Sequence, residues 1–250
     1  MGQAKAGPRT GDKMMKYAIF VLGYILNVSA IYAASGDSDL LEANVNLSNK
    51  TSLQRGAKLF VNYCLTCHSA NYMRYNRMAE DLDLTENDVK NNLMYASDKI
   101  GDTMTIAMSP FESSRWFGIA PPDLSVIARS RGEDWLYSFL NGFYSDQSRP
   151  TGVNNLYFPD TAMPHVLWEL QGLVELHDSG DSNSAEVSMI GKLSDEEYKQ
   201  ATRDLTAFLV YVGEPAKLVR YKIGFWVISF LLVLLLATYL MKREYWKDVK

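Results

Sequence analysis

Two cysteines three positions apart, followed at once by a histidine, are the feature that most constrains the fold of this chain. They are Cys64, Cys67 and His68, and the chain has no other cysteine. A framework of disulfides between distant loops is therefore excluded. The C-x-x-C-H spacing is typical of covalent haem attachment, in which two thiols hold one edge of a haem and the histidine ligates its iron.

Two other chemistries use a C-x-x-C pair. A zinc site needs further Cys or His ligands at matching spacing, and the other histidines of the chain are His165 and His177. A thioredoxin-like redox pair stays open on the cysteines alone, but the histidine directly after Cys67 favours haem. We therefore expect one covalently attached haem c, with His68 as the proximal iron ligand.

The opposite face of the iron needs a second ligand, unless it binds a gas or a substrate. Met163 is the best candidate, because residues 157–164 form an extended segment bounded by prolines that can hold a thioether at a fixed height. Met108, beside Pro110, and His165 are alternatives. The remaining candidates by residue type are Met73, Met78, Met94, Met104, Met189 and His177.

A methionine is by default only adaptable core packing, so the other methionines are expected to pack in the core. Neither His165 nor His177 belongs to a recognisable ligand pattern, and we expect both at the surface. A methionine ligand at Met163 predicts a higher reduction potential than a second histidine would give. The site would then be a six-coordinate electron carrier that is not catalytic on its own.

Apolar residues recur at helical spacing in two segments that bracket the domain. The apolar positions from Leu53 to Val61 predict a helix that delivers Cys64 to its C-terminal end. Ser194 and Glu197 form a capping box before an apolar stripe that ends near Gly213. Between these helices we predict one helix over 124–143, and loops with only short elements over 144–193.

The two ends of the chain have targeting and membrane character. Residues 1–34 predict a signal peptide, with Lys13 and Lys16 before an apolar stretch and a small-residue exit, although an uncleaved anchor is an alternative. Met14 or Met15 is a plausible start, which would leave the residues upstream of it outside the protein. Residues 223–241 carry no charge over 19 positions, which as a helix span about 28 Å, so we predict a transmembrane helix.

Charge is distributed unevenly along the chain. Residues 36–216 contain 26 acidic and 14 basic side chains, a net charge of −12, whereas the whole chain carries −4. A domain this acidic repels nucleic acid and anionic membrane surfaces, and it attracts a basic partner protein. We therefore expect no nucleic-acid partner.

Several motifs together resemble the cytochrome c1 family, in a proteobacterial form. The likeness runs from about residue 53 to the C-terminus and rests on five segments: Cys64–Ser69, Gly118–Ser125, Arg129–Trp135, Pro150–Asn155 leading into Met163, and Met241–Lys247 after the predicted span. The haem motif alone is common to all c-type cytochromes. The ordered set with a C-terminal anchor is specific.

The resemblance implies a haem subunit of the quinol–cytochrome c oxidoreductase, placed beside cytochrome b. It would take electrons from the Rieske iron–sulfur protein and pass them to a soluble or membrane-bound c-type cytochrome. By position it implies Met163 as distal ligand and Pro121 and Pro122 as lining of the haem pocket, although prolines before a helix also form ordinary turns. Arg115 or Arg129 would pair with a haem propionate, or else each is a solvated surface charge.

The expected fold class is mostly α, a cytochrome c-like haem domain with long loops plus one C-terminal transmembrane helix. Its expected parts are an extension and signal peptide at 1–34, a periplasmic haem domain at 35–216, and an anchor with a short cytoplasmic tail at 217–250. The chain would lie in the bacterial inner membrane with a single pass. Two other functions stay open: a free-standing membrane-anchored cytochrome that shuttles electrons between respiratory complexes, and a haem enzyme.

Overall fold

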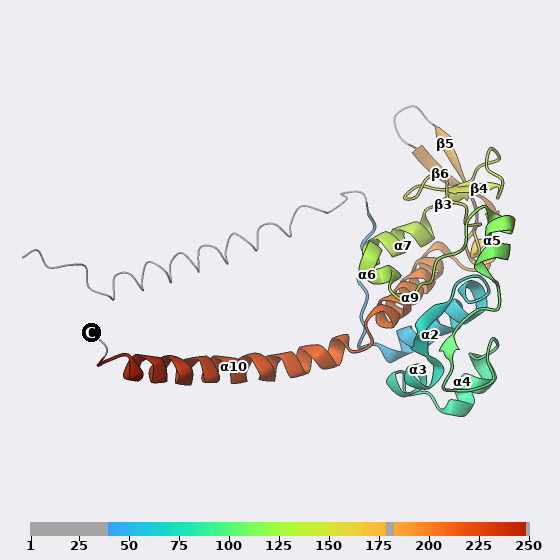
Figure 1. Ribbon diagram of the computed structural model, residues 1–250. Coiled ribbons are helices and arrows are strands. Elements are labelled where there is room, and N and C mark those ends of the chain that lie inside the picture. Colours follow the sequence, from blue (N-terminus) through green and yellow to red (C-terminus); the bar gives the residue numbers. More distant parts are fainter. Residues whose placement is uncertain (1–39, 179–182, 249–250) are drawn as a thin grey trace, which may run out of the picture. The chain divides into compact units, whose positions relative to one another are not determined.

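The computed structural model describes residues 40–178 and 183–248, so the predicted signal peptide lies outside the described residues. Figure 1 shows a mostly helical domain followed by one long helix. The helices are α2 (Lys50–Leu59), a π-helical turn (Phe60–Cys64), α3 (Tyr75–Asp81), α4 (Glu86–Asn92), α5 (Pro110–Phe117), α6 (Ile127–Arg131), α7 (Glu133–Asn141), α8 (Trp168–Gln171), α9 (Asp195–Gly213) and α10 (Lys217–Tyr245).

The strands of the described residues form three separate antiparallel pairs. They are β1 (Ala70–Arg74) with β2 (Thr103–Met104), β3 (Phe143–Ser145) with β4 (Val153–Asn155), and β5 (Gly172–Asp178) with β6 (Asn183–Ile190). The predicted class, mostly α with a C-terminal apolar helix, is confirmed.

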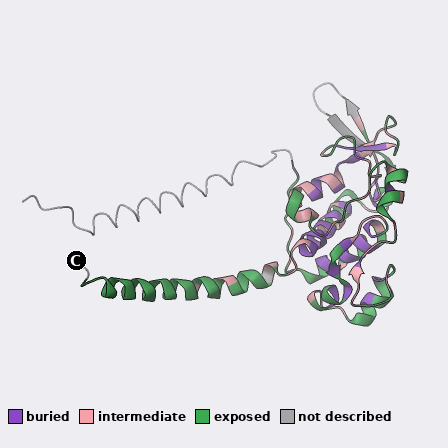
Figure 2. Cartoon of the chain, in the orientation of Figure 1, coloured by how far each residue is buried: buried purple, intermediate pink, exposed green. Residues whose placement is uncertain are grey.

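The core is built on the crossing of α2 and α9. Gly56 lies so close to α9 that a Cβ atom there would meet the Asp204 carbonyl oxygen at 2.1 Å and the Phe208 Cβ at 2.7 Å. The rings of Phe60 and Phe208 lie 5.5 Å apart just beyond this crossing. Helix α9 also contacts α6, α7, α8 and β1, and Figure 2 shows it as one of the most buried elements of the domain.

A buried carboxylate ties the same two helices together. Asp204 accepts hydrogen bonds from Ser52 Oγ at 2.5 Å and from Arg55 Nε at 2.6 Å, and its side chain is almost fully buried. The pKa of Arg55 is raised, chiefly because its guanidinium donates to this carboxylate. The apolar stripe and the Ser194–Glu197 capping box predicted for α9 are confirmed.

The single helix predicted over 124–143 is wrong. Gly132 breaks it, with a φ of 93° that L side chains rarely adopt, and separates α6 from α7. The prediction of loops with only short elements over 144–193 is also wrong, because β5 and β6 form a hairpin of seven and eight residues. A register shift between Leu173 and Val174 interrupts the alternation that would have revealed the first strand.

The segment before α2 is irregular, yet it is held against the domain. Leu41 N–H donates to Ser138 Oγ at 2.7 Å and Ala43 N–H donates to Asp134 Oδ1 at 2.8 Å, both on α7. Order therefore begins well before α2.

The C-terminal helix α10 has 29 residues and is about 44 Å long at 1.5 Å per residue. Within the described residues it is the one helix long and apolar enough to cross a membrane, over Val219–Tyr245. Its apolar side chains are exposed along its length (Figure 2), as expected of a helix surrounded by lipid or by other membrane helices. The predicted transmembrane helix is confirmed as a candidate span.

We predict that Gly56→Ala destabilises the protein because the added methyl group must push α9 away from α2. Overpacking of this kind costs about 1–3 kcal/mol, which exceeds the gain in helix propensity of about 1 kcal/mol. Gly101→Ala is the control, since nothing lies within 4 Å of its Cβ position. Thermal unfolding of the detergent-solubilised protein, followed by circular dichroism, should show a lower Tm for Gly56→Ala only. Equal Tm values for the two variants would refute the close crossing.

Candidate haem site

A π-helical turn brings both cysteines and the histidine into one turn of chain. Leu65 N–H donates to Phe60 O at 2.9 Å, the wider spacing of a π-helix. His68 N–H and Cys67 N–H then both donate to Cys64 O, at 2.8 and 3.0 Å. The end of the α2 segment thus presents Cys64, Cys67 and His68 together, as the sequence predicts.

The imidazole of His68 is oriented by a backbone carbonyl. Its Nδ1 lies 2.8 Å from the carbonyl oxygen of Pro122. Because a carbonyl oxygen can only accept, Nδ1 carries the proton and the lone pair of Nε2 is free. Burial lowers the pKa of His68, partly opposed by the Pro122 hydrogen bond and by Asp123, so the ring is held in its neutral form. A neutral imidazole with one nitrogen fixed by a hydrogen bond is the usual form of a metal-ligating histidine.

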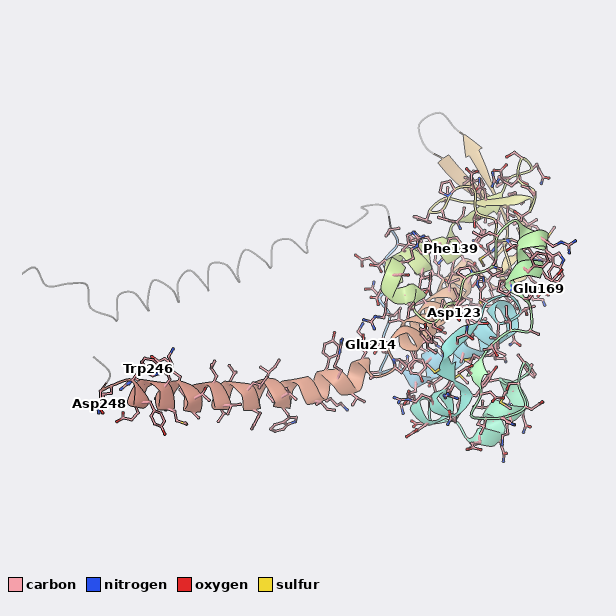
Figure 3. The ribbon with its side chains drawn as sticks, viewed as in Figure 1. Asp123, Phe139, Glu169, Glu214, Trp246 and Asp248 are labelled. Carbon is pink, nitrogen blue, oxygen red and sulfur yellow. The ribbon has the colours of Figure 1, made fainter. Side chains whose placement is uncertain are left out.

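The segment that carries Pro122 is tied to the chain after His68. Leu124 N–H donates to Ser69 O at 2.8 Å, and Asn71 N–H donates to Asp123 Oδ2 at 2.9 Å. Figure 3 labels Asp123. The hydrogen bonds of Asp123 and Leu124, directly after Pro122, limit how far its carbonyl can turn away from His68.

The structure gives Pro121 and Pro122 a position that the sequence did not define. Pro121 is half-buried and Pro122 is exposed. Both precede α6 by several residues, so they do not form its first turn. The role of Pro122 follows from its carbonyl oxygen, and pocket lining by either ring stays a prediction.

The two thiols do not have the properties of a redox dithiol. Burial, with the nearby Cys67, raises the pKa of Cys64 to about 12, and burial also raises the pKa of the half-buried Cys67. Reactive cysteine pairs instead have lowered pKa values. Across residues 40–178 and 183–248, no three His, Cys, Asp or Glu side chains gather in a way that could hold a metal ion. The donor set fits a haem: two adjacent thiols and one oriented imidazole.

Burial separates the methionine candidates for the distal ligand. Met73, Met78, Met94 and Met104 are buried in the hydrophobic core, as expected of packing residues. Met189 is exposed on β6. Met108 and Met163 are half-buried in irregular segments, so burial leaves these two as candidates.

Met163 lies in the connection between β4 and α8, residues 156–167, which we call the Met163 loop. The backbone N–H of Met163 is 3.3 Å from Thr161 Oγ1, whose residue is buried. The irregular segment predicted around Met163 is therefore present. Its distance from the iron position, and hence ligation, stays a prediction.

The expectation that His165 lies at the surface is wrong. Its side chain is 6% exposed, and its ring stacks on Phe143 with the centroids 4.8 Å apart and the planes at 7°. Burial lowers the pKa of His165 to about 4, against a smaller opposing effect of Gln171. Its stacking partner lies on β3, remote in the sequence, so no local pattern could reveal the contact. The side chain of His177 lies outside the described part of the chain.

The two arginines named from the sequence lie in unrelated surroundings. Arg115 is exposed on α5, 3.7 Å from the Glu112 carboxylate. Arg129 is exposed and lines a surface cavity with Glu133, Glu214 and Lys217, and the cavity lining includes neither His68 nor Met163.

The sequence did not reveal Arg131 as a candidate site residue. Its guanidinium lies 4.9 Å from the ring centroid of Trp135 and 5.7 Å from that of Phe158, which belongs to the Met163 loop. The spacing of four residues between Arg131 and Trp135 was the available signal, but Phe158 comes from a distant segment.

Comparison with protein families identifies the family of the chain. The model of the Cytochrome C1 family matches residues 42–249, nearly all of the described protein. The chain belongs to the cytochrome c1 family. The resemblance predicted from the motifs is therefore confirmed, and family membership implies a haem cofactor and a role in electron transport.

The relatives of the chain include proteins named as cytochromes c1 and one with another name. A cytochrome c1 of Allochromatium vinosum is 45% identical over 94% of this chain and all of its own length. A protein of Nitrosomonas europaea named ammonia monooxygenase gamma subunit is also 45% identical, over 94% of this chain and all of its own length. A cytochrome b/c1 of Bradyrhizobium diazoefficiens is 26% identical over 80% of this chain and 34% of its own length.

Proposed function

We propose that this chain is the haem-bearing electron-transfer subunit of a quinol–cytochrome c oxidoreductase, a cytochrome bc1 complex. It takes electrons from a Rieske iron–sulfur protein and passes them to a c-type cytochrome. The observation that carries the proposal is the 2.8 Å contact between His68 Nδ1 and Pro122 O. It leaves Nε2 free as an iron ligand beside two thiols, in a chain of the cytochrome c1 family.

The residues present suit one covalently attached haem. Cys64 and Cys67 would each add their S–H across one vinyl group, so that a thioether forms and no oxidant is consumed. His68 Nε2 and Met163 Sδ would hold the iron. The haem would supply one-electron redox chemistry when bound. Met163 in place of a second histidine raises the potential.

Arg131 is a better candidate for a haem propionate than Arg115 or Arg129. Its guanidinium already lies against the Met163 loop through Phe158, whereas Arg115 is beside Glu112 and Arg129 lines a cavity elsewhere. A planar guanidinium stacked on aromatic rings keeps its N–H fork free to pair with a carboxylate. Pro121 and Pro122 complete the wall near His68.

The chain crosses the inner membrane once, through α10, with the haem domain in the periplasm. The predicted signal peptide at residues 1–34 supports export of the domain at 35–216. Basic residues in the tail, Lys242, Arg243, Lys247 and Lys250, support a cytoplasmic C-terminus. The acidic domain suits a basic acceptor cytochrome, because opposite charges speed encounter.

Cytochrome b is the proposed partner of α10. The name of one relative, cytochrome b/c1, joins the two cytochromes in a single protein. The exposed apolar surface of α10 leaves room for other membrane helices. The alternative is a free-standing membrane cytochrome that meets other respiratory complexes only by diffusion.

We predict that haem attachment requires the two thiols. Cys64→Ala and Cys67→Ala should each retain less haem on a denaturing gel stained for peroxidase activity, because one thioether is lost. The double variant should retain none. A strongly stained double variant would show that haem is not held by these cysteines.

We predict that Met163→Leu lowers the reduction potential and lets ferrous iron bind carbon monoxide, because it keeps side-chain volume but removes the sulfur. A fall of about 60 mV or more is expected, which corresponds to a tenfold preference of the thioether for ferrous iron in a one-electron couple. Redox titration and carbon monoxide difference spectra measure both effects. Met73→Leu, in the buried core, is the control, and identical behaviour of the two variants would exclude Met163 as ligand.

We predict that the intact chain, tagged at its C-terminus and extracted in mild detergent, co-purifies with a b-type cytochrome and an iron–sulfur protein in equal amounts. A chain ending at Arg220 keeps the domain but lacks the span, and should lose the b-type cytochrome. Spectra and protein quantification of the eluate measure this. Isolation of the intact chain without partners would favour the free-standing carrier, and co-elution of an ammonia monooxygenase would assign it to another complex.

A further inference from the structure

The Met163 loop is fixed at its start by a buried asparagine. Asn155, at the end of β4, accepts hydrogen bonds at its Oδ1 from Tyr157 N–H at 2.9 Å and Phe158 N–H at 3.2 Å. Its Nδ2 donates to Phe139 O on α7 at 2.8 Å, and Figure 3 labels Phe139 in this region. Asn155 is 1% exposed. The first residues of the loop are thereby attached to the helical part of the domain.

A second asparagine holds the middle of the loop. Asn154 Oδ1 accepts from Asp160 N–H at 2.9 Å, and its Nδ2 donates to Asp146 Oδ2 at 3.0 Å. The pKa of Asp146 is lowered, first by the Ser148 hydroxyl and then by Asn154. Asn154 therefore connects the middle of the loop to the turn of the β3–β4 hairpin.

Arg149, in the same hairpin turn, holds Asp160 in two ways. Its Nη1 donates to Asp160 Oδ1 at 2.6 Å, and its Nη2 donates to the backbone carbonyl of Asp160 at 3.0 Å. Asp160 has a φ of 63°, in the left-handed region that an L residue adopts at some cost. The fork of Arg149 compensates that cost and fixes the chain direction three residues before Met163.

These contacts end just short of the proposed ligand. Three residues of extended chain reach at most about 10 Å, so a fixed Asp160 confines Met163 to a small volume. Thr161, buried between them, faces the Met163 N–H. After Met163, the stacked ring of His165 holds the other side of the loop.

We propose that Arg149, Asn154, Asn155 and Asp160 form a clamp that positions Met163 and keeps it on the iron. The inference rests on the proposed function, because it requires Met163 as the distal ligand. An outside ligand binds only when the loop is open, so its apparent affinity rises with the open fraction. The clamp residues are positioning residues, since none of them is itself proposed to bind iron.

If the role of the clamp were merely structural, its loss would lower the Tm of the whole domain together with the loop. A positioning role predicts that the Tm stays unchanged. The Asp160 side chain is 75% exposed and the Arg149 side chain 27%, so solvent screens the pair at its aspartate end and limits its contribution to global stability. Loss of the Arg149 contacts should therefore open the loop locally while the α2–α9 core stays folded. Local opening with unchanged global unfolding is the signature of a positioning role.

The test compares two ion pairs, each on an aspartate with a positive φ. Arg149→Gln removes the fork on Asp160. Lys50→Gln removes a 2.6 Å ion pair on Asp83, which is 69% exposed and also has a positive φ, 56°, but lies far from the Met163 loop in sequence. Imidazole is titrated against the ferric haem of each full-length protein, and hydrogen exchange is measured over residues 156–163.

We expect Arg149→Gln to bind imidazole about tenfold more tightly than the parent and to exchange faster over 156–163, with an unchanged Tm. Arg149→Lys, which keeps the charge without the fork, should be intermediate. Lys50→Gln should match the parent. If Arg149→Gln matches Lys50→Gln, or if its Tm falls in step with its imidazole affinity, the clamp proposal is overturned.

Met163→Leu separates failure of the clamp from failure of the proposed ligand. It should bind imidazole more tightly than every clamp variant, because no thioether competes. If Met163→Leu binds imidazole as the parent does, Met163 is not the ligand, and the ligand assignment and the clamp proposal both fail. If Met163→Leu binds more tightly while Arg149→Gln does not, the ligand assignment stands and the clamp alone is wrong.

Discussion

The close crossing of α2 and α9 is the contact on which the rest of the domain depends. Gly56 lets the two helix backbones touch, and Asp204 joins them with a buried carboxylate that Ser52 and Arg55 satisfy. Buried polar groups are costly unless they are paired, so this cluster favours one register of the crossing over its neighbours. The π-helical turn follows α2 directly, and its position is therefore set by the crossing.

The proximal side of the proposed haem site is rigid for the same reason. Cys64 and His68 follow Gly56 by 8 and 12 residues, through the π-helical turn, and the segment around Pro122 is bonded to the chain just after His68. The orientation of the imidazole is thus fixed by backbone groups, which cannot change rotamer. An iron ligand held in this way has little reorganisation to undergo when the iron changes charge.

Local patterns in the sequence predicted the parts of the structure that local interactions determine. The capping box at Ser194 and the apolar stripe of α9 were visible because helix signals repeat every three or four residues. The break at Gly132 was missed because the apolar pattern continues across it, and only the backbone conformation shows the break. The burial of His165 and the stacking of Arg131 on Phe158 depend on partners distant in sequence, which periodicity does not encode.

The two proposed iron ligands, His68 and Met163, differ in the contacts that hold them. His68 is tied to the α2–α9 core, so its displacement requires loss of contacts that hold the whole domain. The Met163 loop is held by the β3–β4 hairpin through the side-chain amides of Asn154 and Asn155, the Arg149–Asp160 ion pair, and the stacking of His165 on Phe143. Local opening free energies are low where few buried apolar contacts are broken. We therefore expect ligand exchange at the proposed distal position, where substitutions can tune ligand retention without unfolding the domain.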